Sequence, residues 1–254
     1  MSRINMNPNL NKIKQDYILL ICHCEKNKEN AEIQKKTWLK NLPKNIIYFH
    51  IIGNNNLKQP FQFYHKEKLL VVKTNDDYNS LPHKMISAFE AIHQTYNYKY
   101  IFKTDDTQIC IKSNFFQGLI FQLNNLYVKA KTILDKSNYG GFIIEIKQET
   151  TSFHNQIHSE LDNNILLQPT RYCSGSFYYL SKDSITYLLT KKNYIEKQKL
   201  EDYSVGIYLP FEYKENMLHI PIHDIFYRFK NDELIHSLHK QSIGKINQYF
   251  IDYK

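Results

Sequence analysis

Two adjacent carboxylates, Asp105 and Asp106, have types and spacing suited to metal chemistry. They follow an apolar segment, residues 100–102, which predicts a buried strand that ends at the acids. Carboxylate oxygens are ligands that Mg²⁺ and Mn²⁺ prefer, and such a cation can stabilise the charge on a departing diphosphate. Acidic pairs after strands also serve as turn residues and helix caps, so the pair alone leaves both interpretations open.

Further segments along the chain share an order and spacing with a known family. They are 18–21 with 32–38, 76–84, 172–181 and 200–206. Together with the acidic segment they resemble family 31 glycosyltransferases, which include β-1,3-galactosyl-, β-1,3-N-acetylglucosaminyl- and Fringe-like enzymes. The similar family motifs are Arg-x-Thr-Trp, Asp-x-Tyr-x-x-Leu-x-x-Lys, Tyr-x-Ser-Gly-x-x-Tyr-x-Leu-Ser and Glu-Asp-Val-x-x-Gly. The resemblance covers most of the chain, although Lys35 stands where the family usually has Arg.

This resemblance implies a reaction and a set of ligand contacts. It implies inverting transfer of a sugar from a nucleotide sugar, a UDP-sugar by analogy, to a hydroxyl of a glycan or glycoconjugate. The motif positions that would contact the donor are Asp105, Lys84, Lys35, Trp38, Ser174 and Gly175. An ordinary core role for Trp38, and a simple turn at Ser174 and Gly175, are the structural alternatives.

The resemblance also implies Mn²⁺ or Mg²⁺, but two alignments of the acidic motif are open. The family usually shows Lys-Thr-Asp-Asp-Asp with the last Asp as direct ligand, which places the neutral Thr107 there. Alignment with relatives that read Asp-Asp-Asp-Thr makes Asp106 the last acid instead. We favour Asp106, with Asp105 beside it, because a hard cation needs a charged ligand. A late His often completes the metal site in relatives, and of His219 and His223 we favour His223.

Inverting transfer requires a base that removes the proton of the acceptor hydroxyl. The resemblance assigns this role to the pair Glu201 and Asp202, with Asp202 as the expected base and Glu201 as the alternative. Both residues could instead stabilise the first turn of the helix that follows.

Composition limits the class of protein and its partners. A chain of 254 residues with 42% hydrophobic residues can bury the core of one large domain, which we place at 17–254 after a polar extension at 1–16. The net charge of +8 is spread over short lysine clusters without a nucleic-acid-binding motif, so we expect no nucleic-acid partner. The four cysteines indicate neither a disulfide framework nor a zinc site.

No apolar run approaches the length of about 18 residues that a membrane helix needs, and the first 16 residues are polar. We therefore expect neither a membrane anchor nor a signal peptide, and a cytoplasmic location. Because relatives are normally anchored in the secretory pathway, a catalytic piece without its anchor is the alternative.

Hydrophobic periodicity predicts alternating strands and helices, the pattern of an α/β fold. The resemblance specifies it as a GT-A-like nucleotide-sugar-binding fold, a mixed central sheet flanked by helices. We expect strands at 17–22, 46–52, 69–73, 100–103, 141–146 and 177–179, and helices at 30–39, 81–95, 114–131 and 182–190. Residues 148–168 form an expected loop, and a strand should carry His219 and His223.

Two other functions remain open at this point. The altered acidic triplet could belong to an inactive glycosyltransferase-like module that only binds a sugar. The basic charge could instead belong to a nucleic-acid-binding protein, whose oligonucleotide affinity would depend steeply on salt.

Overall fold

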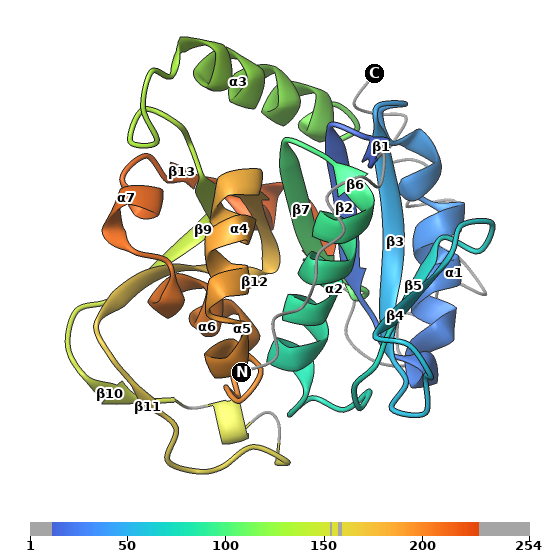
Figure 1. The fold of residues 1–254 in the computed structure, drawn as a ribbon, viewed down its shortest axis with the longest axis vertical. Coiled ribbons are helices and arrows are strands. Elements are labelled where there is room, and N and C mark those ends of the chain that lie inside the picture. The colour runs from blue at the N-terminus through green and yellow to red at the C-terminus, as the bar shows by residue number, and fades with distance from the viewer. Residues whose placement is uncertain (1–11, 153, 157–158, 229–254) are drawn as a thin grey trace.

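A computed structural model describes residues 12–152, 154–156 and 159–228, which form a mixed eight-stranded sheet between helices (Figure 1). The strand order is β13-β9-β12-β7-β2-β3-β5-β4. The inner strands β7, β2, β3 and β5 are parallel, while β12 is antiparallel to β7 and β4 to β5. The bounds of the sheet strands are β2 Tyr17–Cys22, β3 Ile46–Gly53, β4 Phe61–Tyr64, β5 Leu69–Val72, β7 Tyr100–Asp105, β9 Tyr139–Ile146, β12 Thr170–Ser181 and β13 Leu218–His219.

Helices cover both faces of this sheet because its central strands are apolar on both sides. In β2, Ile18 and Leu20 belong to a core with α2 and α4, whereas Tyr17 and Leu19 belong to a core with α3. Such two-sided burial is typical of parallel strands. The helices are α1 Lys28–Lys36, α2 Leu81–Thr95, α3 Phe115–Lys129, α4 Lys182–Thr190, α5 Lys192–Ile195, α6 Glu201–Tyr208 and α7 Phe211–Lys214.

Short elements complete the described part of the chain. Three two-stranded sheets pair β1 with β6, β10 with β11, and β8 with β14. Their bounds are β1 Ile13–Lys14, β6 Tyr96–Asn97, β8 Gln108–Cys110, β10 Thr150–Thr151, β11 Leu166–Leu167 and β14 Phe226–Arg228. Four 3-10 turns lie at Glu25–Asn27, Leu39–Asn41, His154–Gln156 and Ile222–Asp224.

The expected fold class is confirmed: a mixed central sheet with flanking helices, consistent with a GT-A-like glycosyltransferase fold. The helix expected at 81–95 has those bounds, and Pro82 lies in its first turn, where the missing N–H is tolerated. No helix within the described ranges is long and apolar enough to cross a membrane.

Several expected elements differ in detail. The loop expected at 148–168 contains the short strands β10 and β11 and a 3-10 turn. The first helix ends at Lys36 because Thr37 leaves the helical conformation, and a 3-10 turn replaces its last residues. His223 lies in a 3-10 turn and not in a strand. This turn begins at Ile222, directly after Pro221, which has no N–H to donate to a strand ladder. Of the predicted polar extension, residues 1–11 lie outside the described part, and the strand β1 follows at Ile13.

Candidate active site

Asp105 ends β7 at the carboxyl edge of the parallel strands, where α/β folds bind ligands, and Asp106 follows it in the turn. Their side chains have different partners. Asp105 Oδ1 lies 2.7 Å from Lys103 Nζ, and 37% of the Asp105 side chain is exposed. Asp106 is buried, and its Oδ2 lies 2.8 Å from His23 Nδ1 and 3.4 Å from Asn27 Nδ2. Asp105 is therefore the more accessible of the two acids.

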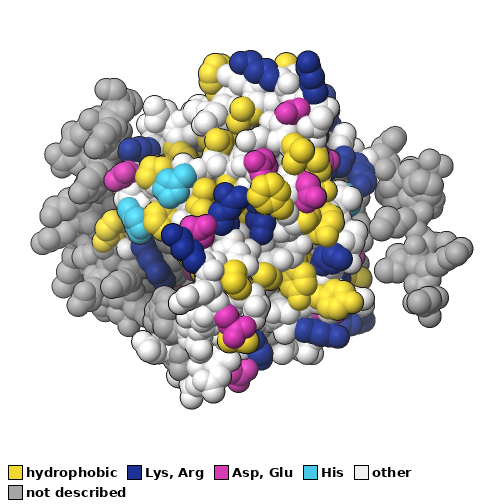
Figure 2. Space-filling view, turned by 90° about the vertical axis from the view of Figure 1, so that its left-hand side faces the viewer, with side chains coloured by type: hydrophobic (Ala, Val, Ile, Leu, Met, Phe, Trp, Pro, Cys, Tyr) yellow, Lys and Arg dark blue, Asp and Glu magenta, His cyan; other side chains and the backbone are white. Residues whose placement is uncertain are grey.

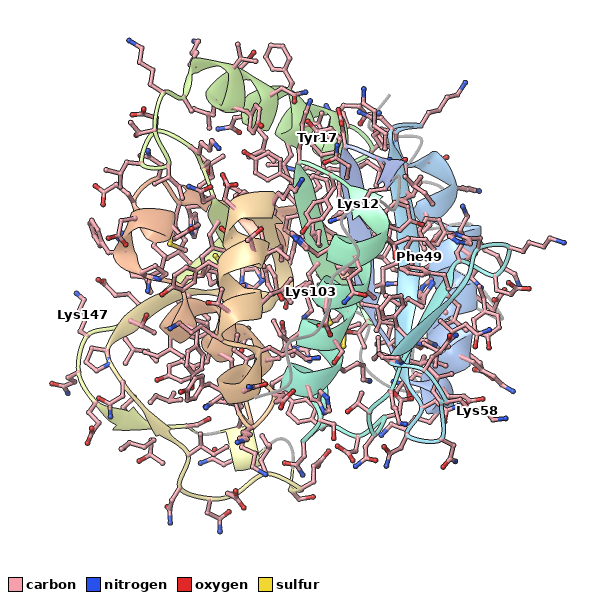
Figure 3. The ribbon with its side chains drawn as sticks, in the orientation of Figure 1. Lys12, Tyr17, Phe49, Lys58, Lys103 and Lys147 are labelled. Atoms are coloured by element: carbon pink, nitrogen blue, oxygen red, sulfur yellow. The ribbon has the colours of Figure 1, made fainter. Side chains whose placement is uncertain are left out.

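Lys103 is the centre of the site, and Figure 3 shows it in the middle of the molecule between the two halves of the sheet. Only 2% of Lys103 is exposed. Besides Asp105, its ammonium contacts the carbonyl oxygen of Gly175 at 2.6 Å and Glu201 Oε2 at 3.2 Å. Burial disfavours this charge, but Asp105 and Glu201 outweigh burial and raise the pKa of Lys103 well above its usual range. A single buried cation thus joins the acids of β7 to those of α6.

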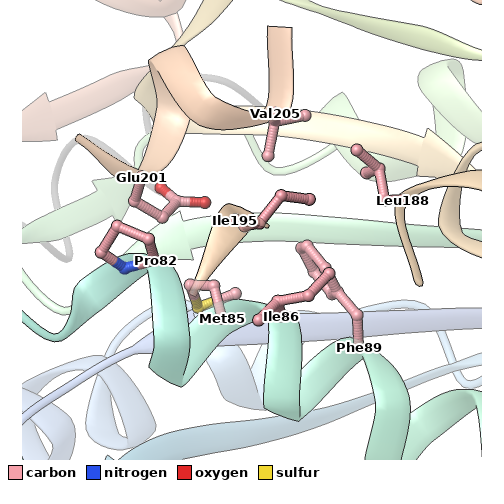
Figure 4. Close-up of a pocket in the computed structure, with 8 residues that line it drawn as sticks. All are labelled: Pro82, Met85, Ile86, Phe89, Leu188, Ile195, Glu201 and Val205. Atoms are coloured by element: carbon pink, nitrogen blue, oxygen red, sulfur yellow. The ribbon is translucent and has the colours of Figure 1, made fainter. Parts of the chain in front are cut away.

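Glu201 begins α6 and is buried against α2. Its carboxylate accepts a hydrogen bond from the Tyr178 hydroxyl, and it borders a small apolar cavity beside Pro82 and Met85 (Figure 4). Burial raises the pKa of Glu201 although Lys103 opposes the shift, since one ammonium is shared by two carboxylates. These contacts fix Glu201 in position.

Asp202 is half-buried and has backbone partners. Its Oδ2 accepts from the N–H of Gly175 at 2.9 Å, and its Oδ1 accepts from the N–H of Tyr203 at 2.8 Å. Neither Asp202 nor Glu201 is the N-cap, which is Leu200; both lie in the first turn, where negative charge suits the helix dipole. The stabilising helix-end role therefore coexists with a position next to the site.

Gly175 lies inside β12, where a bulge between Cys173 and Tyr178 interrupts the pairing with β9. A Cβ atom there would lie 3.2 Å from Lys103 Nζ and 3.5 Å from Asp202 Oδ2. The glycine thus allows its own peptide to approach both charged groups. Ser174 beside it is half-buried, and its hydroxyl contacts Ser176. The segment is part of a strand, not a simple turn.

A second buried ion pair braces the loops at the same edge of the sheet. Lys84 Nζ lies 2.6 Å from Asp76 Oδ1 and donates to the carbonyl oxygen of His23 at 2.9 Å. Asp76 also accepts from the N–H groups of Gly53 and Glu25, each at 2.8 Å. Lys84, which we expect to contact the donor, binds these two protein groups and holds the ends of β2 and β3 together.

Trp38 and Lys35, which we also expect to contact the donor, have partners other than the two acids. Trp38 is buried in the core, its ring 5.9 Å from that of Phe116, which matches the structural alternative of an ordinary core residue. Lys35 pairs with Glu32 at 2.9 Å and lines a cleft of about 210 Å³ between α1 and the strands β3 and β5. Neither residue has a contact with Asp105 or Asp106 among the interactions of the described residues.

The two candidate metal histidines lie beside one aromatic ring. His219 and His223 are exposed, with ring centres 5.3 Å and 5.2 Å from that of Phe142. Within the described ranges, no group of three or more His, Cys, Asp or Glu side chains is arranged to hold a metal ion. The structure thus groups Asp105 with Asp106 but gives no third protein ligand from these residues.

The acidic pair nevertheless suits a divalent cation that phosphates help to hold, because Mg²⁺ commonly uses only one or two carboxylates plus substrate phosphates. Burial raises the pKa of Asp105 against the opposing effect of Lys103, and the charges of Asp106 and Asp202 raise it further. The ionised form of Asp105 is therefore favoured by cationic partners, such as Lys103 or a bound metal ion.

Sequence reasoning missed the polar residues that support the acids from below: His23, Gln34 and His50. All three are buried. His50 could have been noticed as a polar side chain within the apolar segment 46–52, whereas Gln34 lies in the polar segment 28–36 and carries no such signal. The pairing of Asp106 with His23, 83 positions apart, has no local signature.

Comparison with known proteins identifies the family. A model of the Galactosyltransferase family matches residues 30–211, which include most of α1, the acidic motif and α6. The chain therefore belongs to the galactosyltransferase family. This membership supports glycosyltransferase activity and implies a nucleotide-sugar donor and a glycan acceptor. A search of curated proteins finds no significant match.

Proposed function

We propose that this protein is an inverting glycosyltransferase that moves a hexose from a UDP-sugar to a hydroxyl of a glycan or glycoconjugate, with Mn²⁺ or Mg²⁺. One observation carries the proposal: Lys103 and Gly175 bring Asp105 of β7 and the acids of α6 to one place. A donor phosphate group and an acceptor hydroxyl have to meet at such a junction for transfer.

The α6 acids divide the work in this proposal. Asp202 is the base: it is half-buried, its partners are backbone N–H groups, and it lies beside Gly175. Glu201 is the positioning residue, because Lys103 and Tyr178 hold both of its oxygens inside the protein. The base takes the proton of the acceptor hydroxyl as that oxygen attacks the anomeric carbon opposite the leaving diphosphate.

The β7 acids form the donor side. Asp106, with Asp105 beside it, would hold the divalent cation and so help to orient the diphosphate. When bound, the cation supplies charge stabilisation to the leaving group. Lys103 keeps Asp105 at the junction with α6, and Lys84 keeps Asp76 and the ends of β2 and β3 in place. Fixed geometry of this kind accounts for much of the acceleration that enzymes achieve in group transfer.

A specific observation supports one other function, an inactive sugar-binding module. One oxygen of Asp106 is already engaged by His23 and Asn27, and the next residue is the neutral Thr107. A site that binds the cation weakly could still bind the donor and yet fail to transfer the sugar. By contrast, the face shown in Figure 2 carries basic, acidic and apolar side chains in mixture, which gives no support to nucleic-acid binding there.

The test is a donor panel on the purified full chain. UDP-galactose, UDP-N-acetylglucosamine and UDP-glucose are supplied with Mn²⁺ and mixed glycan acceptors, and release of UDP is measured beside calorimetric binding of each donor. The proposal expects binding and acceptor-dependent release with at least one donor. Tight binding without release identifies the inactive module, and absence of binding to every donor contradicts both functions.

A further inference from the structure

Gln34 of α1 is fully buried beneath the acidic motif. Its side-chain amide donates to the carbonyl oxygen of Asp105 at 3.1 Å and to that of Gln108 at 2.7 Å. These two carbonyls stand on either side of the turn formed by Asp106 and Thr107. One NH₂ group therefore fastens both ends of the turn that presents the acids.

His50 of β3 fixes the orientation of this amide. Because the Gln34 nitrogen faces two carbonyl acceptors, its oxygen must face His50 Nε2, 3.0 Å away. Nε2 therefore carries the hydrogen and donates. Burial lowers the pKa of His50 to about 3, with the charges of His23 and Lys35 acting in the same direction, so the ring is neutral. Its Nδ1 has no hydrogen-bond partner among the described residues.

His23 supports the same turn through the side chain of Asp106. The His23 and His50 rings meet edge to face with their centres 5.4 Å apart, and His23 Nδ1 bonds Asp106 Oδ2 at 2.8 Å. From one side of the sheet, the backbone of Asp105 is thus held through Gln34, and the carboxylate of Asp106 through His23.

Packing alone does not require this polar network. A leucine has a shape similar to glutamine and would add apolar contact in a helix that faces a sheet, whereas buried amides and imidazoles cost free energy unless every group is bonded. A network of three polar side chains beneath one turn therefore suggests a requirement for the geometry of the turn.

We propose that Gln34 is a positioning residue for the acidic turn, held in its orientation by His50. The proposal rests on the proposed function, in which Asp105 and Asp106 bind the cation and the diphosphate. Gln34 acts through the backbone of the turn and touches no ligand.

Gln34→Leu tests the proposal, with His50→Phe as a milder variant and Gln62→Leu on the edge strand β4 as the matched control. Two quantities are measured on the full chain: hydrogen exchange of the backbone amides of 105–108, and calorimetric affinity for UDP with Mn²⁺. Thermal unfolding reports global stability in parallel, at temperatures well above those of the other measurements.

Gln34→Leu should speed exchange in the turn and weaken UDP binding by at least ~10-fold. A displacement of about 1 Å in an active site can lower the reaction rate by up to ~100-fold, so a smaller loss of affinity is expected for the same shift. His50→Phe should give smaller changes in the same direction, because Gln34 keeps its two donors in place. Gln62→Leu should change neither quantity.

Unchanged exchange in 105–108 of Gln34→Leu overturns the inference whether or not the protein binds a nucleotide. Wild-type protein that fails to bind UDP with Mn²⁺ overturns the proposed function, while faster exchange would still uphold the structural role of Gln34. Should Gln34→Leu not fold, His50→Phe decides by the same two measurements.

Discussion

At the scale of single residues, the site depends on which polar group each acid contacts. Asp105 and Asp106 are neighbours in sequence, but one contacts Lys103 and the other His23. Asp105 is the last residue of β7, whereas Asp106 is the first residue of the turn, so their side chains reach different partners. The two acids therefore differ in accessibility and in the consequences of substitution.

Asp106→Asn should abolish cation-dependent donor binding, whereas Thr107→Ala should leave it within about 3-fold of wild type. Asn keeps an oxygen that accepts from His23 but loses the negative charge that a hard cation requires. Calorimetric titration of UDP with and without Mn²⁺ measures the effect. Severe loss from Thr107→Ala together with a mild Asp106→Asn would show that the alignment with Thr107 as the ligand position is the correct one.

Asp202→Asn should lower kcat by ~10²-fold or more, the typical contribution of a positioned base, with little change in donor affinity. Asn keeps one oxygen to accept from Gly175 N–H, so that peptide should stay in place, while the hydrogen bond from Tyr203 N–H is lost. Steady-state kinetics with a donor and acceptor measures kcat and KM.

Glu201→Gln is the companion variant to Asp202→Asn. It should lower stability, because the Lys103 ammonium loses one of its two carboxylates. A Glu201→Gln variant that folds normally and has no turnover, beside an active Asp202→Asn, would move the base to Glu201.

At the scale of elements, α6 reaches the site because it packs directly on β12. Gly206 makes this contact: a Cβ there would overlap Tyr172 Cβ and lie 2.9 Å from the carbonyl oxygen of Arg171. The close approach brings the first turn of α6, with Glu201 and Asp202, against the bulge at Gly175. The close contact at Gly206 thus sets the distance between α6 and β12 that the acids in the first turn of α6 require.

Gly206→Ala should therefore destabilise the fold by about 1–3 kcal/mol, as expected for overpacking, and reduce transfer because α6 shifts away from β12. Gly118→Ala on α3 is the control, since no atom lies within 4 Å of its added Cβ. An alanine inside that helix should be neutral or stabilise by up to ~1 kcal/mol. Urea denaturation compares the two, and equal stability of both variants would contradict the role given to Gly206.

At the scale of the whole molecule, burial of ionisable groups should make the protein less stable at high pH. Burial raises the pKa of the Cys22 and Cys110 thiols from 9.0 to about 12, and that of Tyr17 and Tyr96 from 10.0 to about 12. The folded state keeps these protons at a pH where the unfolded chain releases them. Their contribution is complete below the unfolded pKa values and is lost as pH rises through the folded ones.

The free energy of unfolding should therefore fall between pH 9 and 12, by at most ~1.4 kcal/mol per pH unit for each buried thiol. Denaturant midpoints measured across this range test the expectation, with tyrosinate absorbance as a probe of exposure. Cys110→Ala should make the decline less steep. A midpoint that stays constant to pH 12 would show that these groups ionise equally in both states.

The sequence by itself determined much of the architecture. Period-two and period-3.6 patterns are local, so α2 was predicted with its observed bounds and β7 with its start. The ordered motifs predicted the family, because each depends on residue types a few positions apart. The acids at 105–106 and 201–202 were found in the same way, although their roles remain predictions.

Only the tertiary structure decided which buried polar groups meet. Lys103 reaches Gly175 across 72 positions, and His23 reaches Asp106 across 83. A buried charge or amide has to find a partner wherever the fold brings one, and no local pattern specifies that partner. For this reason no sequence pattern predicted that Lys84 pairs with Asp76, and its donor contact stays a prediction, while Trp38 packs in the core, one of the two roles left open for it.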